Sequence, residues 1–464
     1  MYGPDMHWVN SEERRKRGQA RRKQLARQKH SEFSAKDRLT SPLILLQRAA
    51  NGRVPALVKL KYELMMVSPF GYFRGAVPVM AADLAAQPNT GLLVQLCGDA
   101  HVRNLGAYAS EDGRLIFDIN DFDETFRGPF EWDLKRMAAS LFVAGREAGN
   151  KDGACRRAVE GFIASYCTMM RAYAAMPVLD MVRYQVSRME QVAPVHLALQ
   201  KAVRATPQHT LSQLTELVPA KPVKPVKPSK PVKPEEPGAP DAPRRFRESK
   251  PMLTRITGAK AEEVLASLAA YRRTLEPQRQ HFLDQYQPVD VAFKVVGTGS
   301  VGLRDYCVYM EGNGGLDPLF LQIKEEAKSA YVPYLVDTKV ARHQGQRVVD
   351  GQRFIQRGSD PFLGWTTIAG RDYLVRQLND HKASIEIGDL NGDGLLEYAQ
   401  LCGELLARGH GRSGDPQELA GYLGSGMRFA SAVGDFAHAY ADQTEKDWMA
   451  LKRAKRVSAQ TEKE

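Results

Sequence analysis

A repeat of proline and lysine near the middle of the chain limits what its 464 residues can fold into. In the stretch KPVKPVKPSKPVKPEEP every third residue is proline, which fixes φ and removes an amide donor at each of those positions. Such a stretch favours an extended polyproline II spacer over a helix or a strand. We therefore expect two folded halves joined by a Pro/Lys-rich linker over residues 218–251.

The net charge of +11 is concentrated in two segments. Residues 1–40 carry eleven Lys or Arg against five acidic residues, and the linker carries nine against four. The basic stretch 13–30 and the Pro/Lys repeat contain no Phe, Tyr or Trp, which a stacking platform for nucleic acid would require. We expect a basic flexible tail over residues 1–40 and a solvated tether. Weak contact of the tail with nucleic acid or another anionic surface is the alternative.

Composition and cysteine usage indicate a cytoplasmic protein. Hydrophobic residues make up 43% of the chain, enough for at least one sizeable core. No apolar run approaches the ~20 residues that a membrane-spanning helix needs, and the N-terminus lacks the apolar core of a signal peptide. The five cysteines form no CxxC pair, which suits reduced, buried thiols.

Polar side chains cluster around two predicted strands in the first half of the chain. The apolar run 92–96 ends in Gly98-Asp99, and a second run, 114–119, leads into the acidic stretch 120–124. Carboxylates gathered in one pocket repel one another unless a cation or a proton lies among them. Oxygen ligands of this kind suit Mg²⁺, which usually takes one or two carboxylates together with substrate phosphates. The candidates are Asp99, His101, Asn104, Asp118, Asp121 and Asp123; an Asx-rich turn with only structural roles is the alternative.

A glycine-rich stretch in the second half lies between two predicted strands, 291–296 and 303–310. A dinucleotide fold would need a helix after the glycines. A return to a strand instead predicts a hairpin whose tip can fold over nucleotide phosphates. The candidate phosphate-binding residues are Gly297, Thr298, Gly299, Ser300 and Gly302; an ordinary hairpin turn is the alternative.

Lys324 ends a third predicted strand, 319–324, and an ammonium beneath a glycine loop can neutralise phosphate oxygens. Such a lysine normally needs an acidic partner on a nearby helix. The segment 337–354 is predicted to be that helix, and Asp350 is its only interior acid. Asp350 is therefore the expected partner of Lys324, with Glu325 and Glu326 as alternatives on the strand itself.

The two sets of motifs resemble those of protein kinases, in inverted order. Asp99 and Asn104 have the spacing of the kinase catalytic loop, and Gly98-Asp99-Ala100-His101 is similar to the version found in aminoglycoside phosphotransferases. Asp121-Phe122-Asp123 resembles the metal-binding Asp-Phe-Gly, and the strand ending at Lys324 resembles the Val-Ala-Ile-Lys strand. The resemblance implies an α+β, protein-kinase-like two-lobed fold in circularly permuted order, with a small antiparallel β lobe and a larger helical lobe.

In that arrangement residues 41–217 form the helical lobe, 252–385 the β-rich nucleotide lobe, and 386–464 a helical closing segment. Over most of residues 40–450 the chain is also similar to a bacterial family of domains of unknown function, family 2252. Asp133, in one of the shared motifs, is expected to cap its helix or to tie down the catalytic loop. The residues that carry the similarity are Pro69-Phe70, Phe73-Arg74-Gly75, Gly98-Asp99-Ala100-His101, Asn120-Asp121-Phe122-Asp123-Glu124, Gly128-Pro129-Phe130, Trp132-Asp133 and Arg376-Gln377-Leu378.

The resemblance to kinases implies an ATP- and Mg²⁺-dependent phosphotransferase that acts on an unknown small-molecule or protein acceptor. Asp99 would orient the acceptor hydroxyl, and Lys324 would clamp nucleotide phosphates beneath the glycine loop. Asn104, Asp121 and Asp123 would hold Mg²⁺, with Asp118 assisting. The alternatives are nucleotidyl transfer on the same fold, a non-catalytic nucleotide-binding or scaffold protein, and a metal-dependent hydrolase.

Overall fold

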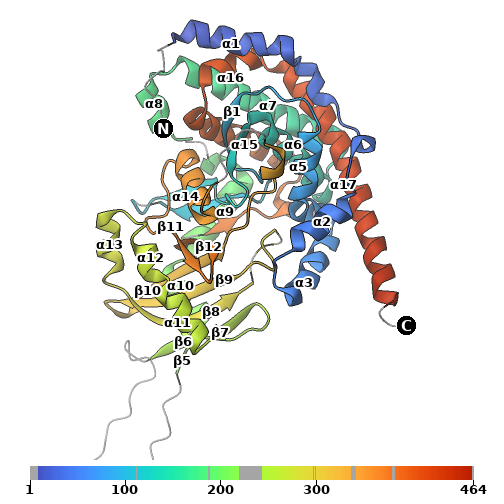
Figure 1. The fold of residues 1–464 in the computed structure, drawn as a ribbon. Helices are drawn as coiled ribbons and strands as arrows, with labels where there is room; N and C mark the ends of the chain where they lie inside the picture. Colours follow the sequence, from blue (N-terminus) through green and yellow to red (C-terminus); the bar gives the residue numbers. More distant parts are fainter. Residues whose placement is uncertain are drawn as a thin grey trace, which may run out of the picture.

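The computed structural model describes residues 9–110, 112–186, 189–218, 243–295, 297, 299–335, 341–378 and 382–461. Within them the protein is α+β, with long helices and sheets whose strand pairs are all antiparallel. Figure 1 shows a β-rich lobe in yellow and orange beneath a larger helical lobe, which is built from both ends of the chain.

A six-stranded sheet forms the β-rich lobe, in the order β11-β12-β10-β9-β8-β7. The predicted hairpin is confirmed, since the glycine loop joins β8 to β9 and these strands pair antiparallel. The strands are β7 (Leu253–Ile256), β8 (Gln287–Lys294), β9 (Asp305–Gly312), β10 (Gly314–Glu325), β11 (Gly364–Ile368) and β12 (Arg371–Gln377).

Strand β9 shows why this sheet is buried on both faces. Tyr306 and Val308 pack in one cluster with Val264 and Tyr271 of the covering helices, whereas Cys307 and Tyr309 pack in a second cluster with Leu211 on the other side. Alternate residues of a strand point to opposite faces, so an unbroken apolar run fits a sheet covered twice. The covering helices are α10 (Pro207–Leu214), α11 (Ala259–Ala266), α12 (Leu268–Arg272) and α13 (Pro277–Leu283), and α14 (Gln344–Ile355) packs against β11 and β12.

Four long helices form the core of the helical lobe: α6 (Phe130–Glu147), α7 (Asp152–Ala175), α15 (Asp393–Ser413) and α17 (Met427–Thr461). Shorter elements surround them. The strands are β1 (Leu93–Leu96), β2 (Leu105–Ala109), β3 (Leu115–Ile119), β4 (Phe126–Pro129) and β13 (Ala383–Ser384). The helices are α2 (Pro42–Ala50), α3 (Pro55–Met66), α4 (Pro69–Gly75), α5 (Val77–Ala85), α8 (Val178–Arg183), α9 (Ala193–Arg204) and α16 (Pro416–Leu423).

The basic N-terminal segment departs from the flexible tail that we expected. From residue 9 onward it is described, and α1 (Ser11–Gln24) packs against α16. The Arg27 guanidinium donates to the carbonyl of Leu423 at 2.6 Å, and His30 Nε2 lies 2.7 Å from the Tyr422 hydroxyl. Part of the positive charge therefore caps the carbonyl end of a helix, a favourable place for cations.

The Pro/Lys-rich stretch from residue 219 to residue 242 lies outside the described residues. The two segments that border this stretch pair with each other, as the antiparallel strands β5 (Thr215–Leu217) and β6 (Arg244–Phe246) at the edge of the β-rich lobe. The predicted linker therefore includes a strand, and α10 packs on β10 rather than in the helical lobe where we placed it. All five cysteines are buried and free, as expected. No helix in the described part of the chain is both long enough and apolar enough to cross a bilayer.

Candidate active site between the lobes

The loop after β1 is fixed by hydrogen bonds to its backbone. The Asp133 carboxylate, at the start of α6, accepts from the amides of Cys97 (2.8 Å) and Gly98 (3.0 Å), so the expected loop-fixing role of Asp133 is confirmed. Gly98 has a φ of +84°, and a Cβ there would collide with the carbonyl of Glu124. Only glycine tolerates both this positive φ and the close approach of the Glu124 carbonyl. The turn at Gly98 is followed directly by Asp99.

Asp99 is paired with a buried arginine. The Arg136 Nε, on α6, donates to Asp99 Oδ1 at 2.6 Å, and the Arg136 side chain is fully buried. Burial raises the pKa of Asp99, and the Arg136 guanidinium opposes that shift. Burial, followed by the charge of Arg74, holds the pKa of His101 well below its ordinary range, so this ring is neutral beside Asp99, with Nε2 at 3.7 Å from Oδ2.

Two of the predicted metal ligands have other roles. Asn104 is buried, and its side-chain amide donates to the carbonyl of Asp99 at 2.6 Å, which fixes the loop; it does not line the cavity described below. Asp118 forms a fully buried ion pair with Arg408 of α15 at 2.5 Å. The prediction that Asp118 assists at the site is therefore wrong, because Asp118 points from β3 into the helical core.

Lys324 joins the two halves of the chain. Its Nζ donates to Asp123 Oδ1 at 2.6 Å and lies 3.7 Å from Asp121 Oδ1. Ser300 of the glycine loop donates to Asp123 Oδ2 at 2.9 Å. Burial alone would lower the pKa of Lys324 and raise that of Asp123. The charges of Asp121 and Asp123 outweigh burial and raise the pKa of Lys324, and the charge of Lys324 lowers that of Asp123. Lys324 and Asp123 therefore form a charged pair.

Asp350 is not the partner of Lys324. Helix α14 turns Val348, Val349 and Gly351 toward the core, so Asp350 faces the solvent side, where the charge of Arg353 acts on it. Of the strand alternatives, Glu325 is bonded to Arg304 (3.0 Å) and to another arginine, Arg371. Among the described residues, the acid that bonds to Lys324 is instead Asp123, from the other half of the chain.

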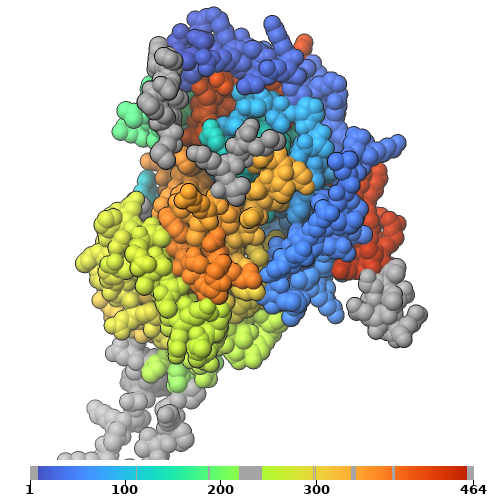
Figure 2. All heavy atoms as spheres, in the orientation of Figure 1, coloured from blue at the N-terminus to red at the C-terminus, as the bar shows by residue number. Residues whose placement is uncertain are grey.

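The segment from α2 to α4 supplies cations that the sequence did not single out. Arg53 donates to the carbonyl of Val301 at 2.6 Å, and Lys61 donates to that of Gly299 at 2.9 Å. These bonds fasten the glycine loop to α3. Burial, with the charge of Arg53, lowers the pKa of Lys61 to about 7. Figure 2 shows the corresponding contact, with the blue N-terminal segment lying against the orange and yellow spheres of the second half.

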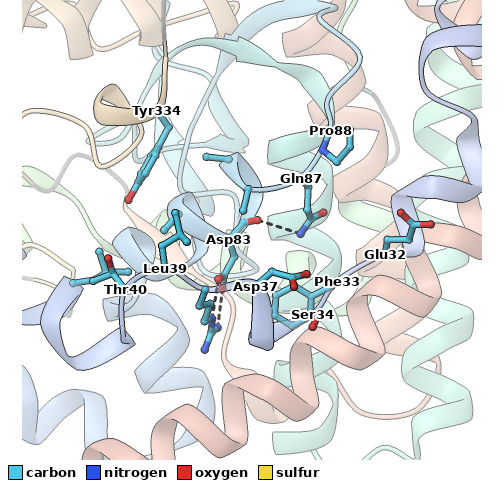
Figure 3. A pocket seen from close by; sticks show the side chains of 15 residues that line it. Glu32, Phe33, Ser34, Asp37, Leu39, Thr40, Asp83, Gln87, Pro88 and Tyr334 are labelled. Carbon is cyan, nitrogen blue, oxygen red and sulfur yellow. Dashed lines mark hydrogen bonds and ion pairs between the residues drawn. The ribbon is translucent and has the colours of Figure 1, made fainter.

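These groups surround one cavity of about 500 Å³ between the lobes. Lys324 and Gly302 do not line it but line a small neighbouring gap that shares Ser300 and Leu303 with it, and Thr298 lies outside the described residues. A second hollow of about 620 Å³ adjoins it, since Leu45 and Tyr334 line both. Figure 3 shows this hollow, with Tyr334 on one side and Glu32 and Pro88 on the other. The charged and polar residues lining the first cavity include Arg48, Arg53, Lys61, Arg74, Asp99, His101, Asp121, Asp123, Glu124, Ser300, Glu326 and Lys328.

Two of the carboxylates that line the cavity lie next to each other. Among the described residues no group of three or more His, Cys, Asp or Glu side chains is arranged to hold a metal ion. Asp121 and Asp123 are adjacent, with the Asp123 amide 3.4 Å from Asp121 Oδ1. A pair of carboxylates suits Mg²⁺, which completes its shell with water and substrate phosphates, better than a metal held by the protein alone.

The chain matches one known protein family. Residues 53–454 match the profile of a family described as uncharacterised proteins conserved in bacteria, DUF2252. The chain belongs to this family. No curated protein and no solved structure matches it. The match of this DUF2252 protein spans the acidic loops, the glycine loop and Lys324, so most of the cavity lining belongs to the family domain; Leu45, Arg48, Ala49 and Asn51 precede it.

Asp305 gives this DUF2252 protein a testable pH dependence. It lies opposite Lys324 on β9, and burial raises its pKa to about 7. The folded carboxyl binds its proton more tightly than the unfolded one, whose pKa is about 3.9. Low pH therefore favours the folded state, and this contribution is lost as pH rises from about 4 to about 7. Asp305→Asn, which cannot ionise, should exceed wild type in stability by about 1–3 kcal/mol at pH 8 and by less at pH 5, measured by urea unfolding. A gap that is constant across this range would contradict the prediction.

Proposed function

We propose that this protein is an ATP- and Mg²⁺-dependent phosphotransferase with the lobes of a permuted protein kinase. One observation carries the proposal: Lys324 and Ser300 of the β-rich lobe both bond to Asp123 of the helical lobe, beside Asp99 and at one cavity. A cation on a strand beneath a glycine loop, opposed by acids on two loops, is the arrangement that phosphoryl transfer requires.

The nucleotide phosphates would lie between the glycine loop and the acidic loops. Lys324 offers a buried ammonium there, and the backbone amides of a glycine-rich loop can bind phosphate oxygens. The bonds of Arg53 and Lys61 to loop carbonyls hold the loop in place before the nucleotide arrives. A prepositioned loop lowers the entropic cost of binding.

Asp121 and Asp123 would hold Mg²⁺, and Asn104 would act only by positioning Asp99. When bound, the ion neutralises charge on the phosphates and orients them. Asp123 already holds two donors, so binding the ion requires Lys324 to turn from Asp123 toward the phosphates. The ammonium of Lys324 would then neutralise the phosphates of the bound nucleotide, instead of the Asp123 carboxylate as in the free protein.

Asp99 would orient the acceptor hydroxyl and receive its proton. The acceptor oxygen forms a bond to the γ-phosphorus, and the bond from that phosphorus to the bridging oxygen breaks, leaving its electron pair on ADP. Arg136 fixes the Asp99 carboxylate through Oδ1, which leaves Oδ2 for the hydroxyl. The adjoining hollow lined by Leu45 and Tyr334 gives an acceptor a place beside the cavity.

A thermal-shift experiment with ATP and Mg²⁺ tests the proposal. Wild type and the control Asp350→Asn should both gain in Tm, because a ligand at 100 times its Kd stabilises the folded state by about 2.7 kcal/mol. Asp121→Asn should lose most of the Mg²⁺-dependent part of the shift. Equal shifts in all three proteins, or no shift in wild type, would contradict the proposal.

Labelled ATP then identifies the reaction. Label from the γ-position should appear on an acceptor, or on water in slow hydrolysis. Transfer of label from the α-position instead would identify a nucleotidyl transferase, with the nucleotide in the opposite orientation.

A further inference from the structure

Arg74 is a cation of the cavity that the proposed function has not used. It lies in the last turn of α4, and among the described residues no hydrogen bond or ion pair reaches its side chain. Its Nε is buried without a partner. Burial, followed by the charge of Arg103, lowers the pKa of Arg74, which reflects the cost of keeping this charge away from water. A buried donor left unsatisfied destabilises the folded state, and more so when it is charged.

The acids around Arg74 already have partners. Asp99 is bonded to Arg136, and Asp123 to Lys324. Asp121 accepts from the amide of Asp123 and is also near Lys324. Each of these acids is therefore neutralised by a cation other than Arg74. A fixed, unpaired guanidinium lining a cavity is suited to an anion that arrives from solution.

The position of Arg74 indicates which anion it would take. Its carbonyl oxygen lies 3.8 Å from the place that a Cβ on Gly299 would occupy, so it sits beneath the tip of the glycine loop. Asp99 and Asp121 are the anions that act on its charge. Arg74 thus lies among the phosphate-covering loop, the acid that orients the acceptor and a metal-binding acid. In a phosphotransferase, the group that passes through this region is the transferring phosphoryl group.

We propose that Arg74 binds the terminal phosphoryl group of the nucleotide and stabilises its charge during transfer. The inference rests on the proposed function and deepens it, because it assigns the γ-phosphate to one residue. The planar guanidinium can donate two parallel hydrogen bonds to phosphate oxygens, which an ammonium cannot do. An arginine that neutralises charge on the transferring group is an established means of accelerating phosphoryl transfer.

The test compares two nucleotides that differ by the terminal phosphate. Binding of ADP and of the β,γ-imido analogue of ATP, both with Mg²⁺, is measured by calorimetry for wild type, Arg74→Gln and Arg74→Lys. Arg74→Gln should lose roughly ten- to a hundred-fold in affinity for the analogue and little for ADP, the effect of one charge-assisted hydrogen-bonded contact. Arg74→Lys should recover part of the loss. Asp350→Asn, which removes an exposed charge on α14 that does not line the cavity, should leave the ratio of the two affinities unchanged.

The outcomes separate this inference from the proposed function. An unchanged ratio in Arg74→Gln, in a protein that binds both nucleotides, would overturn the role of Arg74 and leave the proposed function standing. If wild type bound neither nucleotide, the proposed function would fail, and pyrophosphate would test Arg74 alone. A rise in Tm with pyrophosphate that disappears in Arg74→Gln would support the anion site, and a rise that persists, or none in wild type, would overturn it.

Discussion

Lys324→Met should lower the free energy of unfolding by about 3–5 kcal/mol, the usual cost of removing one partner from a buried ion pair. The ammonium is nearly fully buried and neutralises Asp123 and, at a longer distance, Asp121. Methionine fills a similar volume but leaves those carboxylates without their cation. The same change should abolish nucleotide-dependent transfer. Urea unfolding measures the first effect, and labelled ATP measures the second.

A double variant separates the lost charge from lost packing. In Lys324→Met with Asp123→Asn both partners become neutral, so most of the stability should return while activity stays absent. Asp350→Asn is the matched control, because its carboxylate is exposed on α14, and it should match wild type in both measurements. If Asp350→Asn destabilised the protein as strongly as Lys324→Met, the pairing across the lobes would be wrong.

The strands around the site could be predicted because their patterns are local. The run 92–96 corresponds to β1 (Leu93–Leu96), and 114–119 to β3 (Leu115–Ile119). The glycine hairpin was recognisable from two strands that flank a turn. In each case the residues that decide the structure lie within a few positions of one another. Local turn chemistry and apolar runs are then sufficient.

Helix boundaries were less predictable where a break depends on one residue. The apolar period of residues 71–86 predicts one helix, made imperfect by Pro78, but the segment divides into α4 and α5 around Ala76. The segment 417–451 divides into α16 and α17, where Gly424 and Gly426 both have positive φ. Periodicity continues across such breaks, because both helices face the same core. The break shows only in backbone angles.

The charged pairs of the site lay beyond prediction because they join distant segments. Nothing in the sequence links Arg136 to Asp99, or Arg53 to the glycine loop. The apolar period of α6 gives no reason to expect a buried arginine on it. Arg74 had a signal of another kind, since it lies in the Phe73-Arg74-Gly75 motif shared with the family, but the motif carries no chemistry until the cavity is known. A short pattern can therefore identify the acids, while the fold decides which cation each one meets.

Asp99→Asn should keep nucleotide binding and lower the rate of transfer by about 10²–10⁴, the usual contribution of a positioned acid–base group. Asparagine has the shape of aspartate but cannot take the proton of the acceptor hydroxyl. The change also leaves the buried Arg136 without its anion, so a loss of stability is expected together with the loss of rate. Binding of the imido analogue and single-turnover transfer of γ-label, both measured below the unfolding temperature, separate the two effects.

Asp118→Asn is the control that decides between catalysis and stability. It breaks an ion pair with Arg408 that is fully buried, whereas Asp99 is partly exposed, and that lies outside the cavity. If Asp99 acts on the acceptor, the two variants should lose similar stability, yet only Asp99→Asn should lose transfer. If both lost transfer in proportion to their stability, Asp99 would have no catalytic role. A transfer rate in Asp99→Asn equal to that of wild type would likewise exclude Asp99 as the base. The neutral, buried His101 beside it would then be the remaining candidate for that role.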